Sequence, residues 1–457
     1  MFSTPGIAAL ILLIYIKPQE FIPGLEGMPL LYVFLGLAVF GLVLDLRLAH
    51  AKFDPPPHWP YVALFVPWCY ATYLAKAGTS GFPLAAIDLL IVVVLFFVLA
   101  IGVQSFRSFE TIMASVLGAS MFVAFVCFHQ GFAPLGCAVQ EGGELETLRP
   151  DGRPCEREEE CYLGDAEPGA VYQCERQGLF GTVSVGRGRV RYRGVLKDPN
   201  EISLAIGAAM PMLVARVQRK PSLFRYLSLI VSVVVIAVTI VMTQSRGGTL
   251  VFLAVVAVYF VKRFGVKGAI AGAMLAAPLL LLGGRSGAEA KDSADERTDA
   301  LVAGIQMVQT NPFAGVGFQQ YTEHHNITAH NSYMLAVAEL GIPGLFLFLA
   351  MVYLSFKICY VAARDYQRHA DAKIAATWGT AMLAALAGVA IGSFFLSFTY
   401  HQVLWIYLGL SGALYGVIRK HDPKFKVSLG LTEKVLVLIA AGAFPVAMKV
   451  ALRLKGH

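Results

Sequence analysis

The sequence predicts an all-α polytopic membrane protein with about twelve transmembrane helices. The chain has 457 residues, of which 57% are hydrophobic and only 15% are charged, whereas about a quarter of the residues of a soluble protein are charged. The apolar residues lie in blocks of roughly 17–25, the length that crosses a bilayer as a helix. A transmembrane β-barrel would instead show alternating segments of about ten residues.

The apolar blocks define the expected spans. In chain order they cover residues 2–16, 28–46, 58–75, 84–103, 111–133, 200–217, 223–243, 248–261, 267–284, 343–361, 374–398 and 402–418. A weaker thirteenth segment covers 432–451.

The distribution of Lys and Arg orients these spans. A net charge of +7 would suit nucleic-acid binding in a soluble chain, but here the basic residues cluster in alternate loops, as the positive-inside rule requires. Nucleic acid is therefore not an expected partner. The N-terminus is expected in the cytoplasm, without a cleavable signal peptide because MFSTP carries no positive charge. The orientation of the last segment stays open, since Arg453 and Lys455 would lie outside if it spans.

The same rule places both long loops outside, and the chain then divides into five parts. These are N-terminal helices over 1–133, a cysteine-containing outer loop over 134–199, central helices over 200–284, a polar outer loop with short helices over 285–342, and C-terminal helices over 343–457.

The first outer loop holds four of the seven cysteines, which are Cys137, Cys155, Cys161 and Cys174. An even number on an oxidising side predicts two disulfides, with three possible pairings. No Cys-x2-Cys pair occurs among them, so a zinc site is not expected. We expect a disulfide-stapled surface structure.

The end of this loop carries Arg187, Arg189, Arg191 and Arg193 at alternate positions. In an extended chain this spacing puts all four on one face. Such a ridge suits a phosphate or another anion, because guanidinium binds oxyanions through paired donors. A solvated charge run, paired with the acidic residues 156–160, is the alternative, and the sequence leaves both open.

Two helix starts flank the central spans. Asp198, Pro199 and Glu201 occupy the N-cap, N1 and N3 positions of a standard helix start, whereas Asn200 is not explained by capping alone. The run TQSRGG forms a tight outer turn, and its Arg246 is either a snorkelling anchor or a ligand for a charged substrate.

The second outer loop concentrates polar residues, glycines and a proline. Residues 294–309 have the apolar spacing of an amphipathic helix that ends at Asn311-Pro312. Arg297 would lie in its first turn, where the helix dipole disfavours a cation, so an anionic ligand is a candidate partner. Gly315 and Gly317 allow an unusual backbone after the helix.

A second short helix is expected over residues 331–340, at the outer membrane interface and with His330 as its cap. Gly and Pro at 341–344 should break it from the true span, which would begin near Pro343. This arrangement keeps His330 and Glu339 near the membrane surface. His330 is either a general base, because histidine titrates near neutral pH, or a hydrogen-bonded loop histidine.

Four segments taken in order resemble the bacterial O-antigen ligase and O-antigen polymerase superfamily. They are RYRGVLKDPN, TQSRGG, NPFAGVG after an Arg-led helix, and HNSYMLAVAELGIPG. The resemblance covers roughly residues 190–420. Residues 1–135 match only as hydrophobic spans, and the cysteine loop is not a general feature of the superfamily.

The resemblance implies a GT-C-like membrane glycosyltransferase of lipopolysaccharide or exopolysaccharide biosynthesis. Such enzymes take a glycan from undecaprenyl diphosphate at the periplasmic face of the bacterial inner membrane. The acceptor is a lipid A core sugar for a ligase, another lipid-linked glycan for a polymerase, or a protein hydroxyl for related enzymes. Neither a metal nor a cofactor is implied, and residues 285–342 become the catalytic periplasmic loop.

The resemblance also implies roles for single residues. His330 matches the HN motif and would be the base that deprotonates the acceptor hydroxyl, with inversion at the anomeric carbon. Arg246, Arg297 and one or both of Arg191 and Arg193 would stabilise the diphosphate leaving group. Three further residues would support the site, which are Asn200, Asn331 and Glu339. Glu339 either orients His330 or pins the short helix.

Two choices stay open at this point. Ligase and polymerase share the donor and the motif residues, so the sequence does not separate them. A transporter or flippase of lipid-linked sugars is the alternative from another class, but it should place polar groups near the bilayer midplane on broken helices in related halves. The spans here are nearly free of charge and show no obvious repeat. An acceptor-binding role for the cysteine loop is a hypothesis without a motif behind it.

Overall fold

The computed structural model describes residues 1–140, 148–164, 166–186, 188–282, 288–367 and 372–454. The chain forms two compact units. The first unit consists of Met1–Ile7, Phe34–Ile112 and Arg285–His457, and the second consists of Ala8–Val33 and Met113–Gly284.

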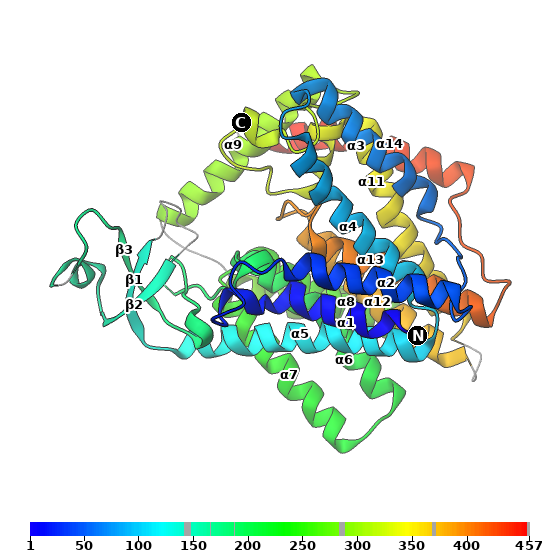
Figure 1. Ribbon diagram of the computed structural model, residues 1–457, viewed down its shortest axis with the longest axis horizontal. Helices are drawn as coiled ribbons and strands as arrows, with labels where there is room; N and C mark the ends of the chain where they lie inside the picture. The colour runs from blue at the N-terminus through cyan, green and yellow to red at the C-terminus, as the bar shows by residue number, and fades with distance from the viewer. Residues whose placement is uncertain (141–147, 165, 187, 283–287, 368–371, 455–457) are drawn as a thin grey trace. The chain divides into compact units, whose positions relative to one another are not determined.

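Most of the described residues are helical (Figure 1). The first unit contains most of α2 (Leu30–Arg47) and all of α3 (Trp59–Ala77), α4 (Phe82–Gly102), α9 (Ala288–Thr310), α10 (Tyr321–His324), α11 (Ser332–Asp365), α12 (Lys373–Gly392), α13 (Gln402–His421) and α14 (Leu431–Leu454). The second contains α6 (Pro199–Arg219), α7 (Leu223–Met242) and α8 (Arg246–Leu282), with the short helices η1 (Pro18–Glu20), η2 (Glu158–Tyr162), η3 (Leu179–Gly181) and η4 (Gly194–Leu196). Helices α1 (Ser3–Ile16) and α5 (Phe106–Phe132) contribute residues to both units.

Nine helices in the described part of the chain are long and apolar enough to cross a membrane, namely α2, α4, α5, α6, α7, α8 as far as Gly265, α11, α12 and α14. This finding supports a multi-pass helical membrane protein. The expected count of twelve is not confirmed, although every expected span coincides with a helix. Helix α1 has only 14 residues, and α3 and α13 are not among the nine.

One expected boundary was confirmed and another was wrong. The spans predicted at 248–261 and 267–284 are two helical segments of α8, separated by a break at Gly265 (φ 61°, ψ −147°); residues 283 and 284 lie outside the described part. The span predicted at 374–398 ends at Gly392, and residues 393–401 form turns instead. The apolar run SFFLSF hid this end, because hydrophobicity alone does not separate a short buried loop from a helix.

The cysteine loop contains a three-stranded antiparallel sheet that the sequence did not predict. Strand β1 (Leu135–Gln140) lies between β2 (Leu148–Pro154) and β3 (Tyr172–Arg176). We call residues 135–176 the cysteine hat. Figure 1 shows that its sheet continues directly from the end of α5.

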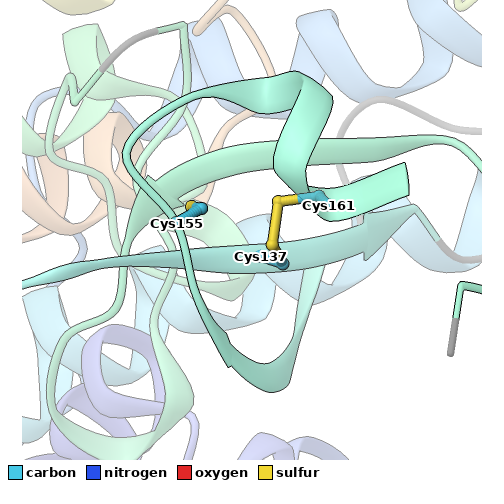
Figure 2. A group of neighbouring side chains, drawn as sticks. All are labelled: Cys137, Cys155 and Cys161. Atoms are coloured by element: carbon cyan, nitrogen blue, oxygen red, sulfur yellow. A yellow bond between two sulfur atoms is a disulfide. The ribbon is translucent and has the colours of Figure 1, made fainter. Parts of the chain in front are cut away.

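Two disulfides join the hat, as expected from the even number of cysteines. Cys137 pairs with Cys161, and Cys155 pairs with Cys174. Figure 2 shows the first bond with Cys155 beside it, and these sulfurs lie within 4.8 Å of one another. Because each sulfur is bonded to another sulfur, none is available as a thiolate. The two bridges close segments with sequence separations of 24 and 19 residues, which stabilises so small a core by about 3 kcal/mol each.

Candidate functional site

The start of α6 has the predicted capping box. The Asp198 carboxylate accepts a hydrogen bond from the Asn200 backbone N–H at 2.6 Å. In return the Glu201 carboxylate accepts from the Asp198 N–H at 3.1 Å. Pro199 occupies N1, as expected.

Asn200 connects the starts of α6 and α8, so its role extends beyond helix capping. Its side-chain amide donates to Asp198 Oδ1 at 2.7 Å, and its Oδ1 accepts from Ser245 Oγ at 2.5 Å. Ser245 Oγ also accepts from the Gly248 N–H at 2.9 Å, at the first turn of α8. A Cβ on Gly248 would overlap Ser203 of α6, so the two helix starts are in close contact.

Arg246 is the first residue of α8 and is exposed. The tight turn predicted before it is present, with Gln244 in the left-handed region (φ 51°). A cation in the first turn of a helix is disfavoured by the helix dipole, and an anionic ligand offsets that cost. The role of Arg246, either a snorkelling anchor or a ligand for a charged substrate, stays a prediction.

The same argument was wrong for Arg297. Helix α9 begins at Ala288, so Arg297 lies inside the helix rather than in its first turn. The N-terminal part of α9 is polar and rich in alanine, and apolar periodicity does not mark such a start. The predicted end of this helix is confirmed, because α9 ends at Thr310.

The arginines of the alternating run are held in different ways, and Arg187 lies outside the described residues. Arg189 and Arg191 are only 7% and 6% exposed, so a solvated charge run is wrong for both. Arg189 Nε donates to the Thr243 carbonyl at 3.1 Å, and Arg191 Nε donates to the Val183 carbonyl at 3.0 Å. Of the described arginines of the run, Arg191 and Arg193 line a common cavity, and Arg189 is not among the residues that line it.

Arg193 is fixed by backbone oxygens. Its two terminal nitrogens donate to the carbonyls of Glu20 and Phe180, each at 2.6 Å. Its Nε is buried and has no hydrogen-bond partner among the described residues. Burial lowers the pKa of Arg193, and the nearby Glu20 carboxylate opposes that shift. A guanidinium nevertheless stays protonated in proteins, so its positive charge is retained.

The cavity beside Arg191 and Arg193 lies within the second unit and has a volume of about 760 Å³. We call it the cationic cavity. Its walls come from residues 17–26, 148–150, 180–183 and 191–197. Among its lining residues are five cationic side chains, Lys17, Arg149, Arg191, Arg193 and Lys197, and two carboxylates, Glu20 and Glu26. A cavity of this size and charge suits an anionic ligand.

In the first unit, His330 lies immediately before α11 and has a left-handed backbone (φ 46°). Asn331, not His330, caps the helix: its Oδ1 accepts from the N–H groups of Tyr333 and Met334 at 3.0 and 2.9 Å. The expected cap, His330, therefore lies one residue before the observed cap. A non-glycine residue held at positive φ is uncommon and is found at functional sites more often than elsewhere.

Ser332 holds the turn of His330 in place, a role that no sequence motif marks. Its hydroxyl donates to the Leu396 carbonyl at 2.6 Å and accepts from the Phe398 N–H at 2.8 Å. Its own N–H donates to the Ser393 carbonyl at 2.8 Å. The partners come from the turn that was expected to be helical, so only the folded chain identifies this support.

The expected break in α11 is confirmed at Gly341 (φ 68°, ψ −173°). The glycine-rich loop after α9 packs directly on it, because Val316 N–H donates to the Ala338 carbonyl at 2.8 Å and Gly317 N–H donates to the Glu339 carbonyl at 2.9 Å. A Cβ on Gly341 would overlap the Phe313 carbonyl, and a Cβ on Gly315 would overlap the Glu339 backbone. The NPFAGVG and ELGIPG motifs therefore form one backbone-to-backbone contact.

Glu339 belongs to this contact. Its side chain is 2% exposed, so it is enclosed by protein rather than lying at the protein surface. Oε1 accepts from the Tyr321 N–H at 3.1 Å, and the carboxylate also interacts with the Tyr400 hydroxyl. The helical residues 332–340, expected at an interface, are likewise buried. These contacts favour the pinning role of Glu339 over the orientation of His330.

Comparison with known proteins gave one family match, over part of the chain. The fold is that of a helical, multi-pass membrane protein with a disulfide-bonded hat. Residues 204–349 match the family model described as O-antigen ligase, which confirms the resemblance to the O-antigen ligase and polymerase superfamily. The match includes Arg246, Arg297, His330 and Glu339. A search of curated proteins gave no match.

Proposed function

We propose that the protein is a glycosyltransferase that moves a glycan from undecaprenyl diphosphate to an acceptor hydroxyl at the periplasmic face of the bacterial inner membrane. The observation that carries the proposal is the O-antigen ligase match over residues 204–349, which contains Arg246, Arg297 and His330. An O-antigen ligase is the first candidate function, and a polysaccharide polymerase with the same donor is the second.

Departure of a lipid diphosphate requires stabilisation of its negative charge, and arginines provide paired donors for it. Arg246 begins α8 beside the start of α6, and Arg191 and Arg193 line the cationic cavity. Arg297 of the first unit belongs to the same family match. We assign these four residues to the diphosphate, and no metal or cofactor is part of the proposal.

The acceptor hydroxyl must lose its proton during attack, since its pKa lies far above neutrality. A positioned histidine supplies this general-base catalysis. His330 fits the role because its backbone is held in a left-handed turn by Asn331 and Ser332. The attacking oxygen forms the new bond to the anomeric carbon as the bond to the diphosphate oxygen breaks, which inverts that carbon.

The first prediction tests His330. His330→Ala should lower glycan transfer at least a hundredfold, because general-base catalysis contributes roughly 10²–10⁴-fold. Transfer is measured with purified protein and lipid-linked donor, and donor is quantified on each side of the membrane in cells. His324→Ala, at an exposed position of the same loop, is the matched control.

Donor should accumulate on the outer side in the His330→Ala strain. Accumulation on the cytoplasmic side would identify a transporter or flippase and would refute the proposal.

Ligase and polymerase are separated by the glycan profile of a deletion strain. Loss of a polymerase leaves single repeat units on the acceptor, whereas loss of a ligase leaves none. Normal lipopolysaccharide with missing exopolysaccharide would identify a polymerase of a different product.

A further inference from the structure

We propose that the cysteine hat forms one wall of a binding site for an oxyanion group of the glycan substrate, with Arg149 as a specificity-determining contact. This inference rests on the proposed function only for the identity of the substrate. The site is the cationic cavity, and every residue that lines it belongs to the second unit.

The hat contributes its strand β2 to the cavity. Leu148, Arg149 and Pro150 form this wall, while Arg191 and Arg193 line the cavity from the segment before α6. Arg149 pairs with Val139 of the central strand, and Pro150 pairs with Ala138. The position of the Arg149 backbone is therefore set by the sheet.

The disulfides hold this wall. Cys155 directly follows β2, and its bond to Cys174 fastens the end of β2 to β3 on the far side of the central strand. The bond between Cys137 and Cys161 fastens the central strand to η2. Since the hat has only a small core around these cysteines and Tyr172, the wall depends on the two bridges.

The charges of the cavity favour an anion. Of its two carboxylates, Glu20 is paired with Lys17 at 3.0 Å and Glu26 is exposed. The guanidinium of Arg193 binds carbonyl oxygens of Glu20 and Phe180, which do not neutralise its charge. Positive charge therefore exceeds negative charge along the wall, and arginines bind phosphate or carboxylate through paired donors.

A polar acceptor accompanies this charge. Gln19 lines the cavity, and its Oε1 is buried without a hydrogen-bond partner among the described residues. A buried acceptor without a donor costs free energy, and a sugar hydroxyl would supply that donor. The combination of cationic groups with an unfilled acceptor suits a sugar that carries an oxyanion. The oxyanion is either the donor diphosphate or an acidic group of the glycan itself.

Direct binding tests this inference on the full-length protein in lipid nanodiscs. Inorganic pyrophosphate and glucuronate are titrated separately by calorimetry, the first as a probe for the diphosphate and the second for an acidic sugar. Arg149→Ala should weaken binding of the recognised probe roughly tenfold or more, because a hydrogen bond to a charged group is worth that much. Arg157→Ala, an exposed hat arginine outside the cavity, should bind as the wild type does.

The double variant Cys155→Ser with Cys174→Ser should weaken the same probe, because the β2 wall is released. If this variant fails to fold, as judged by size-exclusion chromatography, Arg149→Ala carries the test alone. Unchanged affinity in Arg149→Ala, or no binding of either probe to the wild type, overturns the inference.

The binding test of the cysteine hat and the transfer test of the proposed function can fail independently. His330→Ala lies in the first unit and should bind the probe normally while losing transfer. Normal binding by Arg149→Ala together with lost transfer in His330→Ala would refute the role of the hat and leave the glycosyltransferase proposal intact.

Discussion

His330 and Ser332 show how single residues prepare this site. His330 has a positive φ of 46°, and a residue held there costs free energy unless its neighbours over-determine the turn. Ser332 provides this constraint through its hydroxyl, which bonds to both Leu396 and Phe398. The histidine is thus oriented by residues that follow it in the chain and by a turn more than sixty residues away.

We expect Ser332→Ala to destabilise the protein and to reduce transfer. The change leaves a buried carbonyl and a buried N–H without a partner, and each loss costs about 1–3 kcal/mol. Thermal unfolding in detergent and transfer by the purified protein would measure the two effects. Thr322→Ala, which removes an exposed hydroxyl of α10, should change neither. Wild-type melting and activity in Ser332→Ala would show that the turn is held by other means.

Helix α11 illustrates the scale of whole elements. Its break at Gly341 lets the backbone of residues 312–317 contact the helix directly, and the side chain of Glu339 then binds the following loop through Tyr321. The polar loop that carries Asn311 and the helix that follows His330 are thereby joined into one assembly within the first unit. The backbone contact therefore explains the glycines of these motifs without a catalytic role.

Gly341→Ala should be strongly destabilising. Its positive φ disfavours alanine, and the new Cβ would overlap the Phe313 carbonyl, so we expect a cost on the order of 2–4 kcal/mol. Gly442→Ala in α14 is the matched control, because its Cβ would meet no atom within 4 Å and alanine favours a helix by about 0.5–1 kcal/mol. Equal melting temperatures for the two variants would contradict this account of the break.

At the scale of the whole molecule, the proposed reaction depends on orientation in the membrane. The basic loops favour an outward position for residues 134–199 and 285–342, and the two disulfides favour it for residues 134–199. The seven native cysteines give a low labelling background, since four are in disulfides and three are buried.

In intact cells, a membrane-impermeant maleimide should label Glu323→Cys in the second outer loop. It should label Lys220→Cys, between α6 and α7, only after the membrane is made permeable. Both positions are exposed. The reverse pattern would place residues 285–342 in the cytoplasm, where the proposed outer-face reaction cannot occur.

The sequence determined those features that depend on neighbouring residues. The helical spans, the capping box at Asp198, the end of α9 before Asn311 and the break at Gly341 all follow from local periodicity and backbone preference. The motifs also indicated a resemblance to the O-antigen ligase and polymerase superfamily, which the family match over residues 204–349 supports. The start of α9 and the end of α12 were predicted wrongly. The polar start of α9 lacks the apolar periodicity of an amphipathic helix, and the apolar loop after α12 is as hydrophobic as a membrane span.

The tertiary structure decided what depends on distant residues. It chose one disulfide pairing of three, buried Arg191, and made Asn331 rather than His330 the helix cap. It also brought Arg149, Arg193 and residues 17–26 to a single cavity. Segments so far apart in the chain share no periodicity, and packing between them is set by the burial of whole surfaces rather than by any local pattern.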